Sequence, residues 1–301
     1  MKLSKKVKTA LDETRLLILA TQVLFGFQFN GIFQEVFSDL TLPLRLVMVT
    51  SLCLVIISLC LLITPSMQHR LVERGADTNR LHSATTTLAG LALLPLALAL
   101  GLDVFTAVER SFGATVGATA GGLVFALAIV LWYLLEILLR ENTLMPRSEA
   151  EAVTPISAKV EQMLTEARVI IPGAQALLGF QLAVTLTRAF ESLPIESKLA
   201  HVAALCCIAV SIILLMATAA VHRISFAGED PERFLKIGSW FVITGPLPLA
   251  LGVALDTYVA TARALESSVA AASIAGLIGM LLMLMWYAYP ILLRIRQREM
   301  A

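Results

Sequence analysis

Apolar residues gather in eight stretches, each close to the roughly 20 residues that a helix needs to cross a bilayer. Polar and charged residues separate the stretches, and the backbone groups of a helix satisfy one another in lipid, whereas those of an open strand do not. We therefore predict an all-α polytopic membrane protein with eight transmembrane helices. The predicted spans are approximately 16–33, 44–64, 84–105, 116–139, 169–186, 199–219, 237–255 and 269–293.

The first half of the chain recurs in the second half at a constant distance of 153 positions. Comparing residues 4–81 with 157–234, without a gap, gives 26 identities in 78 pairs. After one inserted residue, Trp132-Tyr133 corresponds to Trp286-Tyr287. Because four spans bring the chain back to the side where it started, the two copies must be parallel rather than inverted. We predict two parallel four-helix repeats, residues 1–140 and 154–301, joined by a cytoplasmic linker at 141–153.

Basic residues indicate which side of the membrane each end faces. With the N-terminus in the cytoplasm, the inner segments hold 18 lysines and arginines and the outer loops hold 5. Cytoplasmic loops retain these residues, so both termini are predicted to be cytoplasmic.

The composition agrees with a membrane protein and offers no chemistry of its own. The sequence is 58% hydrophobic, and its four cysteines lie in apolar runs, where we expect free thiols rather than disulfides. Motifs typical of hydrolases, metalloproteases and phosphate-binding loops do not occur. We expect a lipid bilayer as the main partner and no nucleic acid, cofactor, metal or enzymatic activity. The substrate stays unknown, and a homo-oligomer is one option for the assembly.

A pattern recurs in both copies: Glu-x-Arg, a glutamine seven residues after that arginine, Gly-Phe-Gln, then His-Arg and a closing Trp-Tyr. It resembles an uncharacterised bacterial four-span membrane family, domain of unknown function 6328. The resemblance implies a bacterial inner-membrane location and supports the architecture, but it transfers no activity. We interpret the Trp-Tyr pairs as interface-belt aromatics. The residues that carry the pattern are Glu13, Arg15, Gln22, His69, Arg70, Trp132 and Tyr133, and then Glu166, Arg168, Gln175, His222, Arg223, Trp286 and Tyr287.

Two glutamines interrupt the first apolar span of each copy. They are Gln22 and Gln28 in the first copy, and Gln175 and Gln181 in the second. Polar side chains at membrane depth normally face protein or water. We expect them to hold helices together, with Gly26 and Gly179 at close helix contacts; the alternative is a polar site along a permeation or ligand path.

Charged residues at the cytoplasmic ends suggest an ion pair in each copy. Glu13 should pair with Arg70, and Glu166 with Arg223, because span one begins and span two ends on the same side. The alternative is a phosphate or headgroup site built from Arg70, Arg74, Arg80, Arg223 and Arg233.

Asp103 and Asp256 fall near the outer surface. We interpret them as solvated acidic residues, with attraction of cations to an entrance as the alternative. For the whole protein, transport of a small solute or an ion is the first hypothesis, because polar residues recur at membrane depth. A non-transporting scaffold or regulatory subunit is the second, and an intramembrane enzyme the third.

Overall fold

A computed structural model describes residues 3–134, 137 and 154–300, and in this part of the chain the protein is helical without strands. Eight helical segments are long and apolar enough to cross a membrane, which confirms the predicted polytopic all-α fold. The predicted linker at 141–153 lies outside the described residues. The first repeat contains α1 (Leu3–Ile32), the short 3-10 helix η1 (Glu35–Asp39), α2 (Leu42–Leu71), α3 (Asn79–Phe112), α4 (Ala114–Ile129) and a π-helical turn, η2 (Val130–Leu134).

The second repeat follows the same order of spans. One predicted span is divided in two, because α9 ends where the sequence Gly-Pro-Leu-Pro begins. Its elements are α6 (Ile156–Thr185), α7 (Arg188–Glu191), α8 (Ile195–Ser225), α9 (Glu232–Thr244), α10 (Pro246–Leu265), α11 (Ser268–Met283), the π-helical turn η3 (Leu284–Ala288) and α12 (Tyr289–Met300).

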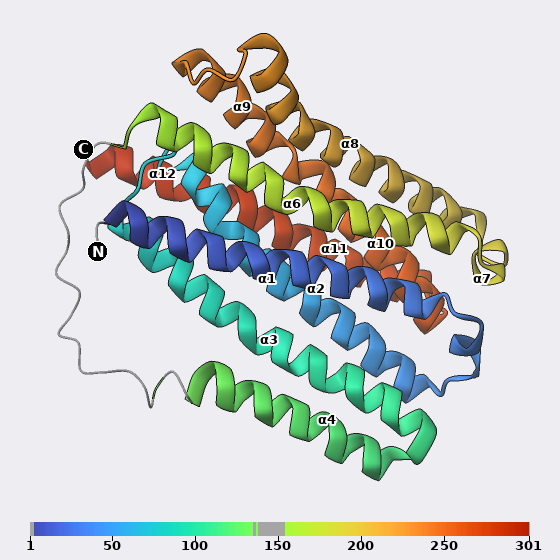
Figure 1. Cartoon of the computed structure of the whole chain (residues 1–301). Helices are drawn as coiled ribbons and strands as arrows, with labels where there is room; N and C mark the ends of the chain where they lie inside the picture. The colour runs from blue at the N-terminus through green and yellow to red at the C-terminus, as the bar shows by residue number, and fades with distance from the viewer. Residues whose placement is uncertain (1–2, 135–136, 138–153, 301) are drawn as a thin grey trace.

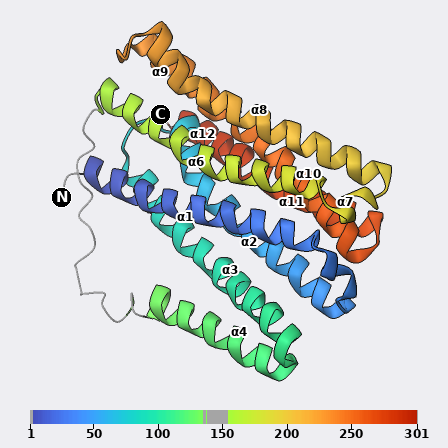
Figure 2. The same ribbon diagram turned by 45° about the vertical axis from the view of Figure 1, so that its right-hand side comes forward.

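The long helices lie side by side, and both termini are at one end of the bundle (Figure 1). We call this the terminal end, and we call the other end the far end. In both views α4 lies at one edge of the molecule and α8 at the opposite edge, with α1, α2 and α6 between them (Figures 1 and 2). The repeats meet where α1 packs along α6 and where α2 packs against α10 and η3.

Two side-chain hydrogen bonds reach the α3 backbone just before a proline in the middle of the helix. Pro95 has no N–H, so the Leu91 carbonyl lacks its helical donor, and two nearby carbonyls accept bonds from neighbouring elements. The Ser58 hydroxyl on α2 donates to the Ala92 carbonyl at 2.9 Å, and the Tyr133 hydroxyl on η2 donates to the Gly90 carbonyl at 2.5 Å. These two bonds hold α2, α3 and α4 together, and the α3 helix continues through the proline.

The second repeat has the same arrangement around Pro248. The Ser211 hydroxyl donates to the Gly245 carbonyl at 2.8 Å, and the Tyr287 hydroxyl donates to the Ile243 carbonyl at 2.8 Å. The hydrogen-bonded positions therefore recur with the sequence. The interpretation of the Trp-Tyr pairs as interface-belt aromatics is wrong for Trp286, which is completely buried, and the two tyrosine hydroxyls bond to the protein backbone.

Candidate functional site

Three helices of the second repeat converge on one carboxylate near the far end. Gln181 on α6 donates its Nε2–H to Asp256 Oδ2 on α10 at 2.7 Å. His201 on α8 places Nδ1 3.8 Å from Asp256 Oδ1. All three side chains are completely buried. Asp256 precedes the end of α10 by nine residues, or about 13 Å of helix, so the carboxylate lies well inside the bundle.

The hydrogen bond at the other side of the His201 ring determines its tautomer. Nε2 lies 3.1 Å from the Gln181 backbone carbonyl, which can only accept, so Nε2 carries a hydrogen. In a neutral imidazole, Nδ1 would then be an acceptor facing a second acceptor, the Asp256 carboxylate. A proton on either Nδ1 or Asp256 removes this conflict. The geometry of the pair therefore favours one added proton, on the His201 ring or on the Asp256 carboxylate.

Asp256 has little other compensation for its charge. Its Oδ1 atom is buried without a hydrogen bond, and within the described residues no lysine or arginine forms an ion pair with it. Ionisable residues in membrane spans are rare and are commonly functional. The interpretation of Asp256 as a solvated acidic residue was wrong, because the helix buries it completely against Gln181 and His201.

The first repeat contains the equivalent Gln–Asp pair with a different third group. Gln28 Nε2 donates to Asp103 Oδ2 at 2.8 Å, and the Ser51 hydroxyl donates to Asp103 Oδ1 at 2.7 Å. Asp103 is half-buried, so the prediction of a solvated residue was wrong here too. Ser51 thus donates a hydrogen bond to Asp103 Oδ1, whereas the equivalent oxygen of the second repeat, Asp256 Oδ1, faces His201 and has no hydrogen bond.

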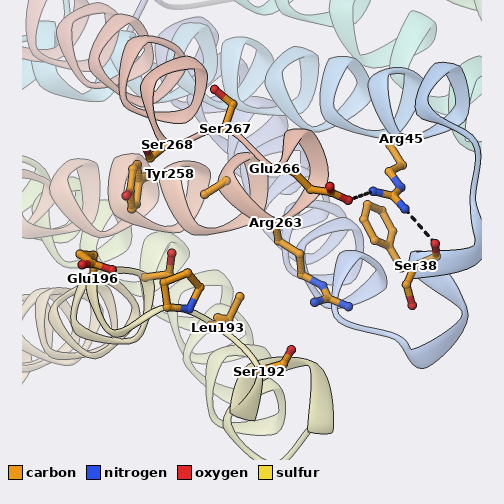
Figure 3. A pocket seen from close by; sticks show the side chains of 14 residues that line it. Ser38, Arg45, Ser192, Leu193, Glu196, Tyr258, Arg263, Glu266, Ser267 and Ser268 are labelled. Carbon is orange, nitrogen blue, oxygen red and sulfur yellow. Dashed lines mark hydrogen bonds and ion pairs between the residues drawn. The ribbon is translucent and has the colours of Figure 1, made fainter.

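A pocket of about 800 Å³ opens at the far end between the two repeats. Figure 3 shows Arg45 in contact with Glu266 at 2.6 Å and with the Ser38 carbonyl at 2.8 Å, and Arg263 beside them. Two lining residues belong to the helices that carry the cluster: Ser197 is one turn before His201 on α8, and Tyr258 is two residues after Asp256 on α10. The pocket and the buried carboxylate thus lie at the same end of the bundle.

A buried ion pair joins the two repeats at the terminal end. Glu166 on α6 accepts from His69 Nδ1 at 2.6 Å and from Arg70 Nε, both on α2. The predicted pairs Glu13–Arg70 and Glu166–Arg223 are wrong. Arg70 pairs across the repeats because α1 packs along α6 and α2 packs against α9, α10 and η3, while Glu13 and Arg223 are both exposed.

Arg70 is not accessible to a phosphate or a headgroup, because it is only 4% exposed and is paired with Glu166. In the second repeat His222 Nε2 lies 3.1 Å from Asp230 Oδ1 instead. In the first repeat the equivalent Asp77 accepts from Gln162 Nε2 at 2.9 Å and ties the α2–α3 loop to α6. In the same loop, burial raises the pKa of the Glu73 carboxyl.

Helical spacing places Arg15, Gln22 and Gly26 in one stripe along α1, and this stripe is buried in only one of its two copies. Gln22 and Arg15 are buried, Arg15 pairs with Asp12, and the Gln22 side chain lies directly against Gly173. Their counterparts Gln175 and Arg168 are exposed.

Gly26 and its counterpart Gly179 also differ in how closely another helix packs against them. A Cβ added to Gly26 would lie 2.3 Å from the Phe180 ring, whereas Gly179 has nothing within 4 Å. The prediction of a close helix contact is confirmed for Gly26 and wrong for Gly179.

The sequence model of a Family of unknown function (DUF6328) matches residues 1–136 and, a second time, residues 155–290. The chain belongs to the DUF6328 family. The two DUF6328 matches follow each other along the chain, consistent with tandem duplication of a DUF6328 unit. Neither a curated protein nor a solved structure matches the chain.

Sequence reasoning missed His201 and Ser51 as parts of the far-end sites. Each is absent from the other repeat, where Met48 and Ala204 take their places, so the duplication itself could not reveal them. A usable signal was the recurrence of both members of the Gln–Asp pair, because glutamine and aspartate at membrane depth require polar partners.

Proposed function

We propose that this DUF6328 protein moves a proton or another small cation across the bacterial cytoplasmic membrane, and that the Gln181–Asp256–His201 cluster is where the cation binds. The observation that supports this is the completely buried Asp256 carboxylate, which has one oxygen without a hydrogen bond and faces a histidine nitrogen 3.8 Å away. An intramembrane carboxylate of this kind needs a positive partner. The far-end pocket opens at the same end of the bundle, and Ser197 and Tyr258 of its lining belong to the helices that carry His201 and Asp256.

We place both termini in the cytoplasm and the far-end pocket on the outside. The distribution of 18 basic residues against 5 supports this orientation. In the fold, residues 109 and 191 lie at the far end and residue 74 at the terminal end.

Labelling of single cysteines introduced at these positions tests the orientation. In intact cells a membrane-impermeant maleimide should modify Glu109→Cys and Glu191→Cys but should modify Arg74→Cys only after permeabilisation. The native cysteines lie in apolar helices, and the wild type measures their background labelling. The reverse pattern would place the pocket in the cytoplasm and contradict the orientation.

Replacement of Asp256 by asparagine should abolish most of the transport. Asparagine still accepts the hydrogen bond from Gln181, so the fold should be kept, but it provides no charge for a cation. A hydrogen bond to a charged group is worth about 1.5–3 kcal/mol, so we expect roughly a 10- to 100-fold fall in cation flux. Proteoliposomes with an internal pH indicator, or with tracer cations, measure the flux.

Asp103→Asn is the matched control, because it changes the equivalent Gln–Asp pair in the repeat that lacks the histidine. If Asp256 acts only by holding helices together, both variants should lose thermal stability together and neither should change flux specifically. If the wild type transports a cation and Asp256→Asn transports it equally well, Asp256 is not part of the cation-binding site.

A non-transporting scaffold or regulatory subunit is the second candidate. It is favoured by the hydrogen bonds of Gln28 and Gln181, which join helices within each repeat. Absence of flux for protons and for small cations in well-folded proteoliposomes would support the scaffold over the transporter.

A further inference from the structure

The two repeats meet through two different faces of their first helices. On α1 the face carries Gln22 and Gly26, and on α6 it carries Gly173 and Phe180. Both contacts are close, since a Cβ on Gly173 would lie 1.8 Å from Gln22 Oε1. The repeats are therefore related head to tail. We call the face with the glutamine and the glycine the donor face, and the face that it packs against the acceptor face; each repeat has both. The pairing inside the chain uses the donor face of the first repeat and the acceptor face of the second repeat.

The unused donor face lies on α6. Its residues are Arg168, Gln175 and Gly179, which correspond to Arg15, Gln22 and Gly26 on α1. Arg168 and Gln175 are exposed, and Gly179 has open space around it. Gln175 lies inside the fifth predicted span, where an amide that faces lipid is unfavourable, so this face is poorly suited to the outside of a finished assembly.

The unused acceptor face lies on α1. Its residues Glu13, Ala20 and Phe27 correspond to Glu166, Gly173 and Phe180 on α6, and all three are exposed. Phe27 is 61% exposed although its ring lies 4.6 Å from the Phe180 ring.

The other contacts between the repeats show the same asymmetry. Trp286 is completely buried and donates its Nε1–H to the Cys60 carbonyl at 3.0 Å. The counterpart Trp132 is only half-buried, and Ile213, the counterpart of Cys60, is 65% exposed.

At the far end Arg263 donates to the Ile32 carbonyl at 2.9 Å. Its counterpart Arg110 is exposed, and Thr185, the counterpart of Ile32, is half-buried. Along the whole length of the interface between the repeats, the residues that correspond to the contacting residues are thus at least partly exposed.

We infer that a second copy of this chain occupies these faces, with the second repeat of one copy docked on the first repeat of the next copy through the same interface that joins the repeats within a chain. The surfaces match because each is a copy of a surface already paired in the fold. In this arrangement Gln175 contacts Ala20 of the next copy, and Gly179 receives its Phe27. The exposed Glu13 of one copy pairs with His222 and Arg223 of the other, as Glu166 pairs with His69 and Arg70.

A charge-reversal series tests the pairing. The measured quantity is the mass of the particle in nanodiscs or mild detergent over a dilution series. Wild-type protein should form a particle of more than one chain. Glu13→Arg and Arg223→Glu should each weaken association, and the double variant should restore it. Arg233→Glu, an exposed site at the same end, should have no effect.

The stripe glycines give a matched pair of variants. Gly179→Leu should weaken association roughly tenfold or more by crowding the interface between copies, with an unchanged melting temperature for the monomer. Gly26→Leu should lower the melting temperature of the monomer itself. The inference would be overturned if the wild-type particle contained a single copy of this chain at every concentration, whether or not another protein was bound to it. Association that is insensitive to both Gly179→Leu and the charge reversals would overturn it as well.

Discussion

Replacing Arg70 by alanine is expected to destabilise the monomer by about 3–5 kcal/mol, because it leaves a buried carboxylate without its cation. Glu166 and Arg70 are both almost fully inaccessible, and His69 is the other group paired with Glu166. Reversible unfolding of diluted, monomeric protein in mixed micelles measures the loss.

The double variant Arg70→Ala/Glu166→Gln should be more stable than Arg70→Ala alone, because it removes the unpaired charge together with its partner. Arg233→Ala, an exposed arginine at the same end, should change the free energy of unfolding by no more than about 0.5 kcal/mol. Additive losses in the cycle Arg70→Ala and Glu166→Gln would mean that the two groups are not coupled.

The eight helices, their order and the duplication could be predicted because each depends on residues close together in the sequence or on a constant spacing. The pairing of Glu166 could not. Both repeats contain Glu, His and Arg at equivalent positions, and the sequence favours symmetric pairs within each repeat. The choice of Arg70 depends on how α1 packs along α6 and α2 against α9, α10 and η3, which is a property of packing between repeats.

The buried state of Asp256 was equally invisible in the sequence. Its position near the end of a span is compatible with solvent, and only the convergence of α6, α8 and α10 excludes water from it. The partner Gln181 was recognised as polar at membrane depth, but its contact with a residue 75 positions away needed the fold.

Trp286→Ala is expected to cost the monomer about 3–5 kcal/mol, as is typical for a large aromatic side chain removed from a packed core. Trp286 is completely buried where η3 packs on α2, and its ring nitrogen bonds to the Cys60 carbonyl. Trp286→Phe should keep most of the packing and lose mainly the hydrogen bond, about 1 kcal/mol. Unfolding in mixed micelles, followed by a probe away from the tryptophans, measures both.

Trp132→Ala is the matched control, because the residue occupies the equivalent position and is only half-buried in the single chain. Burial, rather than residue type, sets the cost of removing an aromatic side chain, so the loss for Trp132 in the monomer should be well below that for Trp286. Equal losses for the two tryptophans would mean that both repeats bury this position alike, which contradicts the asymmetric packing of α2 and α8. The comparison has to be made on the monomer, since docking of a second chain would cover Trp132 as α2 covers Trp286.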